Sequence, residues 1–186
     1  AGGTNQVTTV GVETVTGGAG TDTLVLTNVA NTLTTSGVET ITGGTATDTL
    51  TLTDIANALT VSSIESLTGG TLDDSITLGA AVTGATFDLK AGIDILRLAS
   101  GTNSLTATNV ESVVGGGGTD TLTLAGNGSA ITVSAVETVV GSTGDDAVTL
   151  STTVSGGSFD LGTGTDTLRL VNAVAGQGMT IDLTTP

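Results

Sequence analysis

The chain has 186 residues, with 18 acidic against 3 basic side chains and a formal net charge of -15. Such an acidic surface repels phosphate backbones and anionic membranes and attracts cations, so we expect no nucleic-acid partner. The absence of cysteine excludes disulfides and thiolate metal sites. The longest apolar runs span only a few residues, so we expect no direct membrane insertion.

A sequence unit recurs along the chain, and its first full copy is GVETVTGGAGTDTLVL at residues 11–26. Residues 1–10 resemble the end of a preceding unit. We therefore expect a partial coil over residues 1–10 and a single repeat-built domain over residues 11–186, together forming a fragment of a longer chain. Further full copies begin at Gly37, Ser63, Asn109 and Ala135, and shortened copies begin at Phe87 and Phe159.

Each copy carries one motif aspartate. The seven motif aspartates are Asp22, Asp48, Asp74, Asp94, Asp120, Asp146 and Asp166. Their spacings in the sequence are 26, 26 and 20, twice over, which makes a 72-residue superperiod. A fixed period of this size indicates supersecondary units that stack because none can bury its apolar side alone.

Strand patterns dominate each unit. Leu24 and Leu26 alternate with polar or β-branched residues, as in a half-buried strand, and Gly, Asn and Thr between the strands predict turns. We predict an all-β parallel β-solenoid, similar to a β-helix or β-roll, of about seven coils that follow the 26/26/20-residue repeats. Equivalent residues of successive coils, such as Leu24 and Leu50, would then form buried columns in a rod about 34 Å long.

The turn before the strand holds the candidate site. Residues 17–25, GGAGTDTLV, match the nonapeptide GGxGxDxUx at every defined position, and so do residues 115–123. Glycine permits a positive φ that turns carbonyl oxygens inward, and aspartate adds a hard anionic oxygen, so both can bind calcium. Stacked carboxylates about 4.8 Å apart would repel one another unless a cation lay between them. The predicted calcium ligands are the seven motif aspartates with Gly17, Gly20, Gly115, Gly118 and Gly164.

On this motif the chain resembles the RTX, or haemolysin-type calcium-binding, repeat family of bacterial secreted proteins. The VET or VES sequence before the motif is similar to segments of type I secreted surface-layer proteins and large adhesins. The resemblance implies a calcium-dependent solenoid that is extracellular or located at the bacterial cell surface.

Two acidic sets have alternative interpretations. Each motif aspartate could accept hydrogen bonds from main-chain amides of its turn instead of binding calcium. A second acidic column is interpreted as a solvated charge row that prevents unwanted strand pairing, with cation or partner binding as the alternative. This column consists of Glu13, Glu39, Glu65, Glu111 and Glu137.

We expect a structural module of a surface layer, adhesin or matrix fibre. It would self-associate through its solenoid ends or sides, and a cell-surface glycan is a further candidate partner. The alternative is a calcium-dependent accessory module of a secreted toxin or protease. We do not expect an enzyme, because histidine and tyrosine are absent and the carboxylates are too regular for an acid–base pair. Ice binding ranks last, because Asp73, Ile93 and Asp145 interrupt the threonine row beside the motif aspartates.

Overall fold

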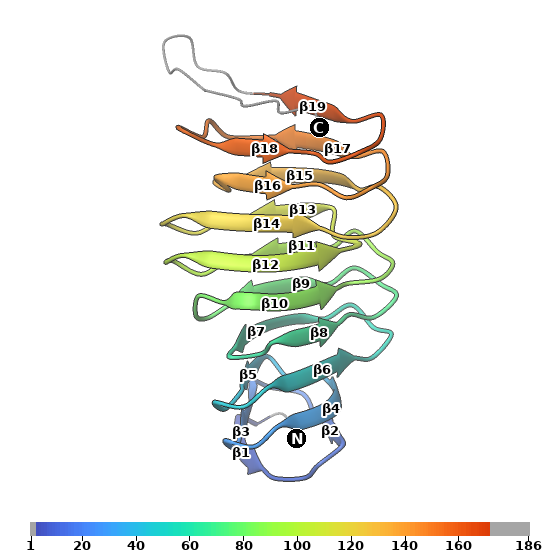
Figure 1. Cartoon of the computed structure of the whole chain (residues 1–186). Coiled ribbons are helices and arrows are strands. Elements are labelled where there is room, and N and C mark those ends of the chain that lie inside the picture. The colour runs from blue at the N-terminus through green and yellow to red at the C-terminus, as the bar shows by residue number, and fades with distance from the viewer. Residues whose placement is uncertain (1–2, 172–186) are drawn as a thin grey trace.

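The computed structural model describes residues 3–171, which form a parallel β-solenoid without a helix (Figure 1). Successive strands alternate between two sheets, so that odd-numbered strands form one sheet and even-numbered strands form the other. The described residues therefore confirm the predicted all-β solenoid class. They contain no helix long and apolar enough to cross a bilayer.

The strands are short, and every strand of the described chain has three to six residues. The odd-numbered sheet contains β1 (Asn5–Thr9), β3 (Asp22–Leu26), β5 (Thr40–Thr42), β7 (Ala58–Ser62), β9 (Ser75–Leu78), β11 (Ile95–Arg97), β13 (Ser112–Val114), β15 (Ala130–Ser134), β17 (Ala147–Leu150) and β19 (Thr167–Leu170). The even-numbered sheet contains β2 (Thr14–Thr16), β4 (Asn31–Ser36), β6 (Asp48–Leu52), β8 (Ser66–Thr68), β10 (Thr83–Asp88), β12 (Asn103–Thr108), β14 (Asp120–Leu124), β16 (Thr138–Val140) and β18 (Ser158–Asp160).

The prediction of about seven coils, each one repeat long, is wrong. Residues that meet in successive turns give the length of one turn. It is 17 residues between Asn5 and Asp22, and 20 residues between Asp74 and Asp94. The odd-numbered sheet has ten strands, so the described chain makes about ten turns and the rod is about 43 Å long. A 26-residue unit holds three strands and spans one and a half turns, whereas the 72-residue superperiod spans eight strands and four turns.

The core lies between the two sheets and is filled by every second residue of each strand. In β3, for example, Leu24 and Leu26 point inward and are buried. Leu24 pairs with Val7 on one side and with Ile41 on the other, so the expected column of Leu24 and Leu50 does not exist. It fails because consecutive 26-residue units begin in opposite sheets.

A left-handed residue bends the chain two positions before each glutamate of the second acidic column. Its φ is 50° at Ala135, 52° at Ser63 and 53° at Asn109, and Gly11 and Gly37 take the same conformation. Non-glycine residues adopt this region at a cost of about 1–2 kcal/mol. The bend turns the chain from one sheet toward the other and carries the glutamate to the edge of the rod.

Candidate functional site

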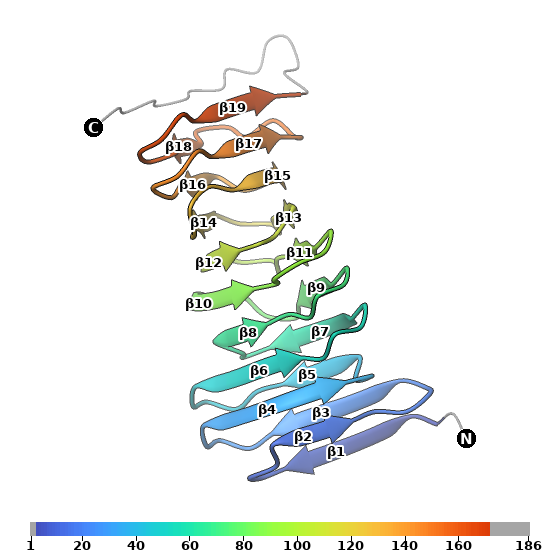
Figure 2. The same cartoon turned by 90° about the vertical axis from the view of Figure 1, so that its right-hand side faces the viewer.

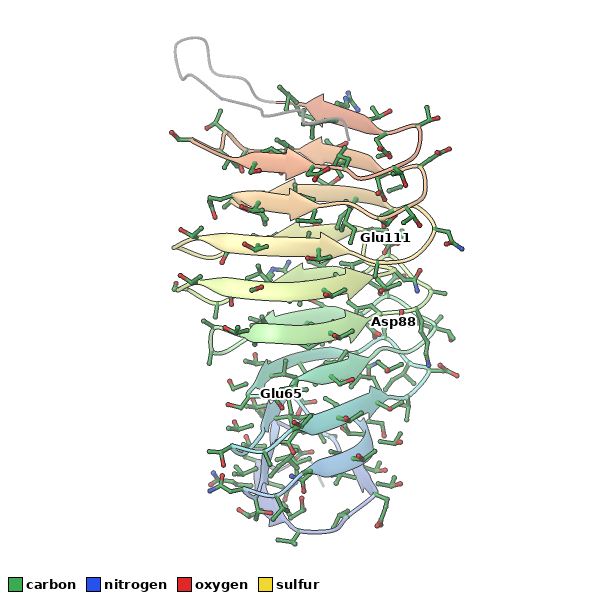
Figure 3. The ribbon with its side chains drawn as sticks, viewed as in Figure 1. Glu65, Asp88 and Glu111 are labelled. Carbon is green, nitrogen blue, oxygen red and sulfur yellow. The ribbon has the colours of Figure 1, made fainter. Side chains whose placement is uncertain are left out.

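The motif aspartates lie along both edges of the rod, where the chain enters one sheet or the other. Asp48 and Asp120 begin strands of the even-numbered sheet, whereas the other five begin or immediately precede strands of the odd-numbered sheet. Figure 3 shows the same division for two glutamates, because Glu65 and Glu111 lie at opposite edges. The expected single column of identical carboxylates is therefore wrong.

Asparagine, aspartate and glutamate from successive turns stack on one another instead, and two aspartates are neighbours in a stack only at Asp74–Asp94 and Asp146–Asp166 within the described chain. In each of these polar stacks, a side-chain oxygen of one turn accepts the main-chain N–H of the residue before it in the stack. The described residues form five polar stacks: Asn5–Asp22–Glu39, Asn31–Asp48–Glu65, Asn57–Asp74–Asp94–Glu111, Asn103–Asp120–Glu137 and Ser129–Asp146–Asp166.

The stack at Asp48 shows the geometry. Asp48 is fully buried, and its Oδ1 accepts the main-chain N–H of Asn31 at 3.0 Å and the Asn31 Nδ2 at 2.8 Å. Its Oδ2 accepts the N–H of Gly44 at 2.8 Å. The Asp48 N–H in turn donates to Glu65 Oε2 at 2.8 Å. The carboxylate thus joins its own turn to the preceding one. An N–H of the same turn donates in the same way to Asp22, Asp74, Asp120 and Asp146, so the interpretation of the aspartates as acceptors for amides of their own turn is confirmed for these five and not for Asp94.

The first glycine of the motif is required by close packing. A Cβ on Gly17 would overlap the carbonyl oxygen of Gly37 in the next turn, and one on Gly115 would overlap that of Ala135. Neither glycine has a positive φ, so the conformation expected at these two positions is wrong. Gly20, Gly118 and Gly164 do have positive φ values of 136°, 128° and 146°, as predicted.

Hydrogen bonding changes the acidity of Asp22. Donation by the Gly18 N–H, assisted by the Asn5 side chain, lowers the pKa of Asp22 below its ordinary value, although burial acts in the opposite direction. Amide donors stabilise the ionised form because they point at its negative charge. The glycine after the first motif glycine therefore supplies an N–H donor for the aspartate.

Asp94 differs from this pattern because its turn belongs to a shortened unit. Its Oδ1 accepts the Asp74 N–H at 2.7 Å, but its buried Oδ2 has no hydrogen-bond partner within residues 3–171. The residue four positions earlier is Lys90, whose N–H donates to Asp88 Oδ1 instead. Burial raises the pKa of Asp94 to about 6, with the negative charges of Asp74, Glu111 and Asp73 adding to the rise.

The glutamate column is not a fully solvated charge row. Glu39, Glu65, Glu111 and Glu137 are half-buried, and each accepts a main-chain N–H from a motif aspartate of the preceding turn at 2.7–2.8 Å. Only Glu13, at the end of the rod, is exposed among the five. The interpretation as a solvated row is wrong for the four interior members, because their carboxylates cap the polar stacks.

Sequence reasoning missed the asparagines that begin the polar stacks. Asn31, Asn57 and Asn103 are buried, and each Nδ2 also donates to main-chain carbonyls of its own turn. A signal was present, because these asparagines follow Asp22, Asp48 and Asp94 by nine residues. This nine-residue spacing could not be interpreted from the sequence, because its meaning depends on successive strands lying alternately in the two sheets.

The fit to calcium differs between the motif aspartates. In the stacks at Asp22, Asp48, Asp74, Asp120 and Asp146, both carboxylate oxygens accept hydrogen bonds, so an ion would have to share or displace amide donors. Asp94 retains one oxygen without a donor, so a cation there would displace no hydrogen bond from that oxygen. No group of three or more acidic side chains within the described chain is arranged closely enough to hold a metal ion.

Fold and site together define a two-sheet parallel β-solenoid whose turns are joined by buried amide–carboxylate hydrogen bonds. Comparison of the chain with protein-family models, with curated proteins and with solved structures gives no match. The functional argument therefore depends on the geometry of the chain itself.

Proposed function

We propose that this chain is a structural module, a stiff rod segment of a bacterial cell-surface or extracellular assembly such as a surface layer, adhesin or matrix fibre. The observation that carries this proposal is the series of polar stacks along both edges. In these stacks the repeated carboxylates accept hydrogen bonds that hold successive turns together. A continuous core under two uninterrupted sheets supports the same role.

The physical reason is that each stack couples neighbouring turns at a buried position. A hydrogen bond to a charged acceptor contributes about 1.5–3 kcal/mol, and an unpaired buried partner costs a comparable amount. Such bonds recur along the rod at one edge or the other, so local opening of a turn that contributes to a stack leaves buried donors and acceptors unpaired. A rod built in this way resists fraying and bending.

The proposal includes a calcium ion bound at Asp94. There a cation would supply the partner that Oδ2 lacks and would offset the repulsion from Asp73, Asp74 and Glu111. At the other motif aspartates calcium binding stays a prediction. The resemblance to RTX repeats and the net charge of -15 support an extracellular, calcium-rich setting for the chain.

The test is a calcium titration of the purified chain, followed by circular dichroism and light scattering, and then reversed with a chelator. We expect a folded β spectrum in chelator, a higher melting temperature in calcium, and loss of that increase in Asp94→Asn. Magnesium serves as the control ion, because it demands a tighter octahedral geometry. An unfolded chain in chelator would refute a rod held by its own hydrogen bonds and would favour the accessory module of a secreted toxin or protease.

A further inference from the structure

The outer face of the even-numbered sheet carries a regular array of hydroxyl groups. In β4, β6 and β8 every outward side chain is serine or threonine. Residues two apart in a strand point to the same side, so each strand presents a pair such as Thr49 with Thr51. The pair Thr106 with Thr108 continues the pattern in β12. Figure 1 shows this face from the front, and no segment of residues 3–171 covers it.

The strand pairing arranges these side chains in two columns along the rod. The first column consists of Thr32, Thr49, Ser66, Thr86, Thr106 and Thr123. The second column consists of Thr34, Thr51, Thr68, Asp88 and Thr108. Paired strands lie about 4.8 Å apart and alternate residues of a strand about 6.7 Å apart, so the columns form a two-dimensional lattice about 24 Å long.

The opposite face shows that the strands themselves do not require this composition. Threonine suits any outward position of a strand. In Figure 2, β10 and β12 lie on one side of the rod, and β9 and β11 lie on the opposite side. There the outward positions of the odd-numbered sheet include Val25, Ile95, Arg97 and Val114. The lattice is therefore a property of one face and not of the solenoid as a whole.

The even-numbered face carries almost no charge, although the chain has a net charge of -15. Asp88 and Asp160 are the only charged outward residues of the even-numbered strands in the described chain. Asp88 ends β10 (Figure 3), and its Oδ1 accepts the Lys90 N–H at 3.1 Å and the Asn109 Nδ2 at 2.8 Å. A partner of this face would therefore meet hydroxyl and methyl groups rather than ions.

The hydroxyl groups of the first column are available to water. Within residues 3–171 they make no hydrogen bond to another residue, and each can donate one hydrogen bond and accept two. Most of these side chains are half-buried between their neighbours in the column. Branching at Cβ also restricts rotation about χ1 in threonine. The hydroxyl and methyl groups therefore occupy fixed, repeating positions.

We propose that the outer face of the even-numbered sheet binds the surface of an ice crystal. The oxygen lattice of ice repeats at distances close to those between paired strands and between alternate residues of the array. Water held by one threonine hydroxyl is therefore placed in register with water held by the next. The methyl groups fill the spaces between these waters, and they leave bulk water favourably. Each contact is weak, but the lattice makes many contacts at once.

This lattice is distinct from the interrupted threonine row beside the motif aspartates. That row lies in the turns at the edges of the rod, whereas the two columns lie in strands of one sheet. Ice binding at the columns needs only the folded face, so it goes beyond the proposed structural role and does not depend on bound calcium.

The first test is thermal hysteresis, the gap between the melting and growth temperatures of an ice crystal, measured on the purified full chain in chelator. We expect hysteresis and faceted crystals, both lost in Thr106→Lys, because the long charged side chain holds ice away from the array. The matched control is Thr60→Lys, the same change at a half-buried threonine between Thr40 and Thr77 on the opposite face, which should keep the hysteresis.

Circular dichroism of the same samples checks the fold. A folded wild type without hysteresis, or equal effects of the two lysine substitutions, would overturn the proposal and leave the structural role intact. An unfolded wild type would refute the rod itself and with it this face.

The second test asks for a gain of activity, which a damaged fold cannot produce. Asp88 interrupts the second column between Thr68 and Thr108, so Asp88→Thr completes the column and should increase the hysteresis at equal protein concentration. The control is Arg97→Thr, which replaces a charged side chain beside Thr77 on the opposite face and should leave the hysteresis unchanged. No increase in Asp88→Thr, or an equal increase in both variants, would overturn the assignment of ice binding to this lattice.

Discussion

Two isosteric substitutions distinguish an aspartate whose two carboxylate oxygens both accept hydrogen bonds, Asp120, from one whose second oxygen has no donor, Asp94. At Asp120, Oδ2 accepts the Gly116 N–H at 2.9 Å, while Oδ1 accepts the N–H and Nδ2 of Asn103 at 3.2 and 2.7 Å. In Asp120→Asn the new amide nitrogen must face one of these donors, whichever way it is oriented. At Asp94 the Oδ2 atom faces no donor, so Asp94→Asn creates no such conflict.

The magnitudes follow from the bonds lost. Asp120→Asn removes a charge-assisted hydrogen bond and leaves buried donors facing each other, which destabilises the fold by ~3 kcal/mol. For a chain of this size each kcal/mol lowers the melting temperature by about 2–4 °C, so we expect a decrease of about 6–12 °C. Asp94→Asn removes a buried charge repelled by Asp73, Asp74 and Glu111, so at neutral pH its stability should equal or exceed that of the wild type.

The assay is urea and thermal unfolding followed by far-UV circular dichroism, because the chain has neither tryptophan nor tyrosine for fluorescence. Both variants are measured in chelator, so that cation binding does not contribute. Equal destabilisation by the two substitutions would refute the distinction between the two sites. A tolerated Asp120→Asn would refute the role assigned to the polar stacks.

Three further outcomes follow from the packing and the charges. Gly17→Ala should destabilise the fold by about 3 kcal/mol, because the added Cβ overlaps the next turn. Gly18→Ala is the control: its Cβ would lie in open space, so the unfolding free energy should change by less than about 0.5 kcal/mol. Ala135→Gly should stabilise by about 0.5–1 kcal/mol, since it relieves a left-handed conformation, and urea midpoints for the two proteins check this. The contribution of Asp94 to stability is largest below its unfolded pKa of 3.8 and is lost as the pH rises through about 6. The melting temperature of the wild type, measured relative to that of Asp94→Asn, should therefore rise when the pH is lowered from 7 to 5. A difference that stays constant over this range would contradict the raised pKa.

The division of the chain into turns could not be predicted from the repeat. Strand Asp22–Leu26 and strand Asp48–Leu52 have nearly the same sequence, DTLVL and DTLTL, yet they lie in opposite sheets. A sequence repeat records when the same local structure recurs, and here that is after three strands. How many strands complete one turn depends on which strands pair, and that is a property of the whole solenoid.

The chemistry of the motif shows the same limit. Gly17 and Asp22 are predicted calcium ligands, and that prediction stays untested; in the structure Gly17 allows close approach of the next turn and Asp22 accepts amide hydrogen bonds. Glycines and an aspartate in a tight turn suit both an ion and a main-chain amide, because each presents positive charge to oxygen. The sequence therefore left both interpretations open.

By itself the sequence determined the parts that depend on local rules. Alternation of apolar and polar residues specified strands, glycine-rich turns specified their ends, and the recurrence of one unit specified a solenoid. Only the tertiary structure decided that Asn31, Asp48 and Glu65 meet, because they belong to three consecutive turns and to three different places in the repeat. The physical reason is complementarity, since each carboxylate is stabilised by the amide donors that the neighbouring turn brings to it.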